Sequence, residues 1–203
     1  YGAVAEWKAN VLADAASKFA SGAFEELRAG FDTFCRENAF WLEDYALYRA
    51  SRTAHGDKAW YEWPEDLRFR RPNALNAARG ILKNEIFAQK FYQFLFFRQW
   101  SELKAYAAEK NVKFIGDIPI FVALDSSDVW CNQGEFKLNA DGSPKVVSGV
   151  PPDFFSSTGQ LWGNPIYDWD AMVKDGFSWW IARIAWTLKA VDVVRIDHFR
   201  GFE

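Results

Sequence analysis

Two short apolar runs, each leading into a charged residue, constrain the fold of this chain more than any other feature of its sequence. The first run covers residues 112–117 and is followed by Pro119, and the second covers residues 191–197. Short apolar runs bounded by Gly and Pro are typical of buried strands. A helical pattern opens at Asp170, between the two runs. The apolar face of that helix consists of Phe177, Trp180, Ile181, Ile184 and Leu188. The order strand, long loop, helix, strand predicts one βα unit that leads to a second, parallel strand of an α/β fold.

The residues before the first run have the spacing of helices. A polar and aromatic stretch over residues 53–72 predicts a surface loop, and a long helix over about 73–110 follows it, with a break near Gly80 and an end at Asn111. We therefore expect a mainly helical part over residues 1–110 and an α/β part over residues 111–203. Within the second part, residues 121–167 show little periodicity, and loops of that length are usually functional.

The composition is that of a globular protein and excludes several classes of function. Half of the 203 residues are apolar and a quarter are charged, so the chain can bury a sizeable core. A net charge of -3 without a basic run argues against nucleic acid as a partner. Charged residues interrupt the first twenty positions, and no apolar stretch approaches the ~20 residues that cross a bilayer. We expect a soluble cytoplasmic protein without membrane association, in which Cys35 and Cys131 are reduced thiols.

The second apolar run ends in a cation and an anion that share one face of the strand. Because side chains alternate along a strand, Arg195 and Asp197 point the same way, with Cα atoms about 6.6 Å apart at ~3.3 Å per residue. In a parallel α/β barrel the carboxyl end of the strands holds the active site. A nearby guanidinium favours the ionised form of an aspartate, which is the form that a nucleophile needs. The strand pattern alone fits equally well an ordinary buried ion pair, with His198 capping the next turn.

Three blocks of sequence, in order, resemble the amylomaltase (disproportionating enzyme) family of 4-α-glucanotransferases. The run Arg-Ile-Asp-His-Phe-Arg-Gly at residues 195–201 resembles the nucleophile motif of that family. The run Gly-Asp-Ile-Pro-Ile-Phe-Val at 116–122, with the residues up to 130, resembles its segment after an earlier barrel strand. The stretch 149–165, which begins Gly-Val-Pro-Pro-Asp and ends Trp-Gly-Asn-Pro, resembles its long substrate-binding loop. The helical first third resembles the helical insertion of these enzymes, so the resemblance covers nearly the whole chain.

The resemblance implies a fold and an activity. The fold is part of a TIM (β/α)8 barrel with a helical insertion on its N-terminal side, ending after the strand that bears the nucleophile. The activity is retaining transfer of α-1,4-glucan segments between maltooligosaccharides, through a covalent glycosyl-enzyme on Asp197. Arg195 and His198 would line the catalytic subsite, and 121–167 would be the substrate-binding loop. The residues that would contact substrate are Asp117, Asp153, Gln160 and Trp162.

Each of these substrate contacts also has a purely structural interpretation. Asp117 fits a turn-forming residue before Pro119. Residues 153–162 fit a well-packed polar loop with a buried Trp. We interpret Trp60, Trp63 and Tyr45 as core residues rather than binding residues.

A complete barrel takes ~250 residues before insertions, and the first hundred or so residues of this chain read as helices. We therefore expect the chain to be part of a longer protein, with its general acid/base and a third carboxylate outside these residues, and we expect the fragment itself to be inactive. Glu203 follows the nucleophile motif too closely to be that acid. Two alternatives stay open, an α-amylase-type glucan hydrolase and a non-catalytic glucan-binding homologue. No cofactor or metal is expected, because no His, Asp or Glu cluster has ligand spacing.

Overall fold

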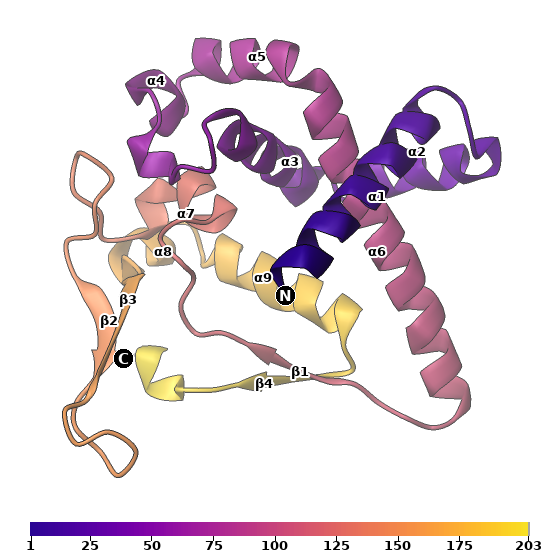
Figure 1. Ribbon diagram of the computed structural model, residues 1–203. Coiled ribbons are helices and arrows are strands. Elements are labelled where there is room, and N and C mark those ends of the chain that lie inside the picture. Colours follow the sequence, from indigo (N-terminus) through magenta and orange to yellow (C-terminus); the bar gives the residue numbers. More distant parts are fainter. Residues whose placement is uncertain (203) are drawn as a thin grey trace. The chain divides into compact units, whose positions relative to one another are not determined.

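The computed structural model describes residues 1–202, which form two compact units (Figure 1). The first unit contains Tyr1–Lys58 and Arg70–Glu102, and the second contains Ala59–Phe69 and the chain from Leu103 onward. The division of the sequence at residue 110 stays a prediction about domains. No described helix combines the length and the apolar character needed to cross a lipid bilayer. Both cysteines are present as thiols, as expected.

Helices build the first unit. Its elements are α1 (Gly2–Ala20), the 3-10 helix η1 (Glu25–Leu27), α2 (Arg28–Glu37), α3 (Ala39–Ala54), α5 (Pro72–Ile81) and most of α6 (Lys83–Glu109). The long helix expected over 73–110 is confirmed together with its break, since Leu82 separates α5 from α6. Pro72 opens α5 at a position where its missing N–H costs nothing. Asn111 follows the end of α6 in a left-handed conformation (φ 56°), which suits an Asn just beyond a helix.

Stacked phenylalanines form the core of the first unit. Phe19 on α1 is fully buried, and its ring stacks on Phe91 of α6 at 4.6 Å between centroids. The ring of Phe31 on α2 lies edge to face against the Phe19 ring, with 5.3 Å between centroids. The guanidinium of Arg28 lies 4.1 Å from the centre of the Phe19 ring and donates a hydrogen bond to the Phe19 carbonyl. The cluster therefore joins α1, α2 and α6 through one aromatic side chain.

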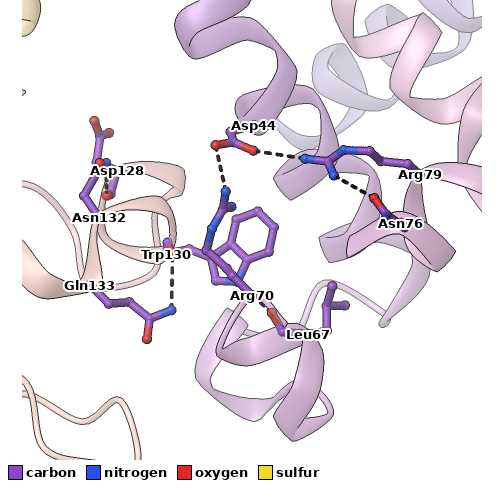
Figure 2. A network of polar contacts seen from close by, with 9 residues as sticks. All are labelled: Asp44, Leu67, Arg70, Asn76, Arg79, Asp128, Trp130, Asn132 and Gln133. Atoms are coloured by element: carbon purple, nitrogen blue, oxygen red, sulfur yellow. Dashed lines mark hydrogen bonds and ion pairs between the residues drawn. The ribbon is translucent and has the colours of Figure 1, made fainter. Parts of the chain in front are cut away.

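An acidic residue links two further elements of this unit. Figure 2 shows Asp44 on α3 between two arginines, Arg70 at 2.8 Å and Arg79 of α5 at 3.7 Å. All three side chains are partly buried or exposed, so the pairs contribute orientation more than free energy, about 0–1 kcal/mol each.

The second unit contains short elements around a parallel strand pair. They are η2 (Trp60–Glu62), α4 (Glu65–Arg68), β1 (Ile115–Ile118), α7 (Ser127–Cys131), η3 (Gln133–Glu135), β2 (Val147–Val150), β3 (Gln160–Pro165), α8 (Trp169–Lys174), α9 (Ser178–Ala190), β4 (Val193–Ile196) and η4 (Phe199–Phe202). β1 pairs in parallel with β4, and β2 pairs antiparallel with β3 (Figure 1). The predicted βα unit is thus confirmed. The segment 121–167 is not one continuous loop, because it contains α7, η3 and the β2–β3 pair.

The prediction that both strands are buried is wrong for the residues described. Ile115 is 70% exposed and Val193 is 46% exposed, although these two residues are paired across the sheet. Within residues 1–202, β1 and β4 pair only with each other, and α9 packs against β4. A two-stranded sheet in contact with one helix leaves a face and both edges without cover, so apolar side chains on that face stay exposed.

The prediction of a single helix from Asp170 to about residue 190 is also wrong, because the chain makes two helices, α8 and α9. Gly176 and Phe177 between them have φ of 73° and 59°, which a continuing helix cannot accommodate. The carboxylate of Asp175 then accepts hydrogen bonds from the hydroxyl and the amide of Ser178 at the start of α9. Of the expected apolar face, Trp180 is 5% exposed whereas Ile181 is 63% exposed.

Tryptophans form the core of the second unit, as expected for Trp60 and Trp63, which are 0% and 3% exposed. The Trp60 indole N–H donates to the carbonyl of Leu124 at 2.6 Å. Trp130 on α7 is fully buried, and its indole N–H donates to the Leu67 carbonyl at 3.1 Å (Figure 2). The indoles of Trp60 and Trp130 therefore each donate to a backbone carbonyl of another segment, which links those segments. Among the described residues the indole N–H of Trp180 on α9 is buried without such a partner. In the first unit, Tyr45 is partly buried.

Candidate active site

The parallel pairing of β1 with β4 brings two carboxylates to one arginine. Asp117 and Arg195 are opposite each other in register. Arg195 donates from Nε to Asp117 Oδ1 at 2.5 Å and from Nη2 to Asp117 Oδ2 at 2.7 Å. The same Nη2 lies 3.5 Å from Asp197 Oδ2. The prediction that Asp117 and Asp197 lie at the carboxyl ends of neighbouring parallel strands, with Arg195 on the same face as Asp197, is therefore confirmed as geometry.

The register that produces this contact is held at the opposite ends of the strands. Asp192, just before β4, accepts a hydrogen bond from the Phe114 amide at 2.9 Å and lies 3.4 Å from Lys104 Nζ. These contacts lower the pKa of Asp192, first through the Phe114 hydrogen bond, so the link stays charged at neutral pH. Gly116 lets β1 approach the residue before Asp192, since a Cβ there would lie 2.8 Å from Val191 Cγ1. A shift of one residue in this pairing would move Arg195 away from Asp117.

A sharp turn follows the second carboxylate. His198 has φ 50°, and its backbone N–H donates to Asp197 Oδ1 at 3.0 Å. One oxygen of Asp197 therefore faces the following amide and the other faces Arg195. Both interactions fix the orientation of the Asp197 side chain.

The three charged side chains of this cluster are exposed in the part of the chain that the structure describes. Among residues 1–202 the side chains of Arg195, Asp117 and Asp197 are 60%, 56% and 62% exposed. The hydrogen bonds that Arg195 donates to Asp117, and then the charges of Asp117 and Asp197, raise the pKa of Arg195. An exposed pair of this kind contributes little to stability. The cluster is a rigid, accessible, charged surface on which a polar ligand can make several hydrogen bonds.

Trp162 on β3 packs against His198, the residue that follows Asp197. Their rings meet edge to face, with centroids 4.7 Å apart. The Trp162 indole N–H donates to the side-chain oxygen of Gln160 at 3.1 Å. The structure thus brings together Gln160, Trp162 and His198, and Trp162 is partly exposed among the described residues.

Asp153 is the predicted site residue that the structure leaves apart from this group. It lies between β2 and β3, and its Oδ1 accepts hydrogen bonds from the amides of Phe155 and Ser156 at 2.9 and 2.8 Å. Among the described residues its hydrogen bonds remain within its own turn. The neighbouring Phe154 and Phe155 are 97% and 87% exposed, so the turn presents two aromatic rings to solvent.

Sequence reasoning missed Tyr167 and Arg183, which hold the backbone next to Asp117. Tyr167 is fully buried and donates its hydroxyl hydrogen to the Ile120 carbonyl, and Arg183 on α9 donates to the Pro119 carbonyl. Tyr167 fell in a segment without periodicity, and Arg183 fell off the expected apolar face of its helix. Glu203 lies outside the described residues. Within residues 1–202, no three His, Cys, Asp or Glu side chains gather as metal ligands would.

Comparison with known proteins identifies the family. A family model described as 4-alpha-glucanotransferase matches residues 1–203. The 4-alpha-glucanotransferase of Thermus thermophilus is 49% identical over 203 residues, which are 100% of this chain and 41% of that protein. The one from Synechocystis sp. is 46% identical over 198 residues, 97% of this chain and 39% of that protein. This chain therefore spans about two fifths of the length of the relatives it matches.

Among solved structures, the amylomaltase from Streptococcus agalactiae in complex with acarbose superposes with a TM-score of 0.93 at 39% identity, covering 100% of this chain and 41% of that one. The amylomaltase from Corynebacterium glutamicum superposes with a TM-score of 0.61 at 19% identity over 87% of this chain and 22% of that one, which supports the fold alone. The fold class expected from the sequence, part of a TIM barrel with added helices, is confirmed. The chain belongs to the 4-alpha-glucanotransferase family.

Proposed function

We propose that the complete protein to which this chain belongs transfers α-1,4-glucan segments between maltooligosaccharides with retention of configuration. The observation that carries the proposal is the Asp117–Arg195–Asp197 cluster at the carboxyl ends of two parallel strands. Carboxyl ends of strands are where barrel enzymes hold their reactive groups. The family to which the chain belongs supports the substrate class, and so does the acarbose complex of the Streptococcus agalactiae amylomaltase.

In this proposal Asp197 is the nucleophile. One carboxylate oxygen attacks the anomeric carbon of the donor glucan, the glycosidic C–O bond breaks, and the leaving oxygen takes a proton from a general acid. A hydroxyl of an acceptor glucan then attacks the anomeric carbon, loses its proton to the same group acting as base, and displaces Asp197. Arg195 and the His198 amide hold the Asp197 side chain oriented for the attack.

The proton has to come from a second carboxyl group. A retaining enzyme needs two carboxyl groups about 5–5.5 Å apart. Among the described residues Asp117 is the carboxylate that shares Arg195 with Asp197, but both of its oxygens accept hydrogen bonds from that guanidinium. A carboxylate so engaged is suited to orienting groups and not to delivering a proton. We therefore propose that Asp117 orients the substrate and the Arg195 side chain. We also propose that the general acid/base lies outside residues 1–202.

The remaining predicted site residues have substrate-binding roles in this proposal. Trp162 offers a flat ring against which a sugar can stack, and His198 and Gln160 can exchange hydrogen bonds with sugar hydroxyls. Asp153 acts indirectly, because its carboxylate shapes the turn that carries the exposed rings of Phe154 and Phe155.

A chimaera tests the proposal. Residues 1–203 would replace the matching segment of the Thermus thermophilus relative, and glucose and longer maltodextrins formed from maltotriose would be measured. We expect the chimaera to transfer glucan and Asp197→Asn to lose roughly 10⁴-fold or more of that activity. Asp170→Asn, a change of the same chemistry on the exposed surface of α8, should leave it unchanged. A folded chimaera without transfer activity, or an Asp197→Asn variant within a few-fold of its parent, would exclude the assignment.

A further inference from the structure

The backbone that follows β1 is held by side chains of distant segments. Arg183 Nη2 donates to the Pro119 carbonyl at 2.6 Å, and the Tyr167 hydroxyl donates to the Ile120 carbonyl at 2.7 Å. Two residues further on, the side-chain amide of Asn164 donates to the Val122 carbonyl at 3.0 Å. Backbone carbonyls that leave a strand need partners when they are buried, and Ile120 is only 5% exposed. The path of the chain directly after Asp117 therefore depends on these donors.

Arg183 is the residue that ties the first two of these contacts together. Its guanidinium donates to the Pro119 carbonyl with one nitrogen and lies 3.3 Å from the Tyr167 hydroxyl with the other. The guanidinium also lies against the rings of Trp179 and Trp180, 5.1 and 4.9 Å from their centroids. A planar fork held against two rings and two oxygen acceptors is oriented in advance, which a lysine at the same position could not reproduce.

Tyr167 connects the backbone at Ile120 with the aromatic rings of Phe121 and Trp162. It is fully buried, and burial raises the pKa of its hydroxyl, so the group remains a donor at all ordinary pH values. The ring of Phe121 stacks on Tyr167 with 5.8 Å between centroids. Phe121 in turn lies 6.5 Å from the ring of Trp162, whose other neighbour is His198 at 4.7 Å.

A second contact joins the same backbone to the motif after β4. A Cβ at Gly201 would lie 2.7 Å from Ile120 Cγ1 and 3.3 Å from the Phe121 ring, so the two segments touch without space for a side chain. Any movement of Ile120 and Phe121 must therefore change where residues 198–201 lie. The hydrogen bonds from Arg183 and Tyr167 to Pro119 and Ile120 oppose such a movement.

We propose that Arg183 is a positioning residue for the glucan site. Through the Pro119 carbonyl and the Tyr167 hydroxyl it sets the backbone after Asp117, and thereby the relative positions of Trp162 and His198. It touches neither Asp117 nor Asp197, so its effect is on the geometry of the binding surface. The inference rests on the proposed function in so far as it names glucan as the ligand; the coupling of Arg183 to His198 stands without it.

The chain contains two histidines, which makes the coupling measurable. The ring protons of His198 lie beside the Trp162 indole and carry its ring-current shift, whereas His55 is in the first unit and serves as the internal reference. Proton NMR of the 203-residue chain would compare Arg183→Gln, Arg183→Lys and Tyr167→Phe with the parent. The matched control is Lys189→Gln, which removes a cation from the same helix and its contact with Trp186.

We expect Arg183→Gln and Tyr167→Phe to move the His198 resonances towards those of a histidine in a short peptide, with His55 unmoved. Arg183→Lys, which keeps the charge but not the fork, should move them partway, and Lys189→Gln should not move them. Titration of maltoheptaose, followed by the same resonances, should show binding weakened by roughly five- to tenfold in Arg183→Gln, because an unheld surface must be ordered on binding.

Three results would overturn the inference. One is a fall in melting temperature in Arg183→Gln with the His198 resonances in place, which would make the arginine merely structural. Another is an equal movement in Lys189→Gln. If Arg183→Gln does not fold, the test is made with Arg183→Lys. Unmoved His198 resonances in Arg183→Lys would then be the third result that overturns the inference. If the parent chain binds no maltoheptaose while His198 still responds to Arg183→Gln, the coupling stands and the assignment of a glucan site to these residues loses its support.

Discussion

Arg195 and Asp117 lie directly opposite each other in the parallel pairing of β1 with β4, and two hydrogen bonds of 2.5 and 2.7 Å join guanidinium to carboxylate. The third member of the group, Asp197, reaches the same guanidinium at 3.5 Å. One arginine therefore sets the spacing between two carboxylates on different strands. This relationship would be lost if either the register of the strands or the fork shape of the side chain changed.

Arg195→Lys should separate the role of the fork from that of the charge. An ammonium group cannot make two parallel hydrogen bonds to Asp117 and still approach Asp197. In the chimaera with the Thermus thermophilus relative, we expect transfer from maltotriose to fall by roughly 10- to 100-fold. The melting temperature should stay nearly unchanged, because the pair is exposed. Arg79→Lys, at the Asp44 pair of the first unit, is the matched control and should leave transfer intact.

The 203-residue chain on its own should transfer no glucan. Within residues 1–202 the carboxylate next to Asp197 is Asp117, whose two oxygens already accept hydrogen bonds from Arg195. Without a positioned acid the leaving sugar departs as a poorly stabilised alkoxide, and general acid catalysis is typically worth ~10²- to 10⁴-fold. Incubation of the purified chain with maltotriose should give no longer maltodextrins than a blank without enzyme. Longer products would show that the acid lies within these residues.

Asp128 should make the chain less stable as the pH rises. Burial raises the pKa of Asp128 above its ordinary value of 3.8, and the charge of Arg183 only partly opposes this. A carboxyl group whose pKa is raised by folding does not lower the free energy of unfolding below its ordinary pKa, because it is then protonated in both the folded and the unfolded state. As the pH rises through the raised pKa, the group lowers the free energy of unfolding more and more. Asp128→Asn should therefore raise the melting temperature by roughly 2–4 °C at pH 7, which corresponds to a gain of about 1 kcal/mol in the free energy of unfolding. At acid pH the melting temperature should rise little.

The pH profile of the melting temperature checks this assignment. Asp170→Asn, on the exposed surface of α8, should change the melting temperature little at either pH. A gain in Asp128→Asn that is larger at acid pH than at pH 7 would contradict the assignment of the cost to a buried charge.

Trp60 and Gly142 should be coupled in stability. Trp60 is fully buried, and a Cβ at Gly142 would lie 2.9 Å from its ring. Gly142→Ala must therefore displace the indole in addition to straining a backbone with φ +87°. We expect Gly142→Ala to lower the free energy of unfolding, measured with denaturant, by roughly 2–4 kcal/mol. In a Trp60→Phe background the smaller ring leaves room, so most of the added cost should disappear.

Gly176→Ala provides the control for this cycle. Gly176 also has positive φ (+73°), but a Cβ there would meet nothing within 4 Å. Its substitution therefore measures the backbone strain alone, and it should cost less than Gly142→Ala. Equal costs at the two glycines, or a Gly142→Ala cost that does not depend on Trp60, would show that the ring contact has no energetic weight.

The strands and the charged cluster could be predicted because their signals are local. An apolar run that ends at Gly or Pro, and a cation and an anion two residues apart, are visible in a few consecutive positions, and they led to Asp117, Arg195 and Asp197. The burial of the strands could not be predicted in the same way. Exposure at Ile115 and Val193 depends on which other elements cover the sheet, and no short segment carries that information.

The break between α8 and α9 and the role of Arg183 were missed for a related reason. Helical periodicity continues through Gly176 and Phe177, although their positive φ values end one helix and start another. Arg183 falls off the expected apolar face of its helix, so the pattern suggests a solvated side chain. Its partners, Pro119 and Tyr167, are 64 and 16 residues away along the chain, and only the folded chain brings the three together.

The side-chain clamp on the segment after β1 has a consequence for how the molecule folds. The carbonyls of Pro119, Ile120 and Val122 accept hydrogen bonds from donors that are 64, 47 and 42 residues away along the chain. Such contacts can form only after long loops have closed. Loop closure lowers the entropy of the chain before the contacts supply any favourable free energy. During synthesis, the segment next to Asp117 emerges well before Arg183 and β4. We therefore expect the site to assemble late and in one step, so that no partial version of it precedes the docking of α9.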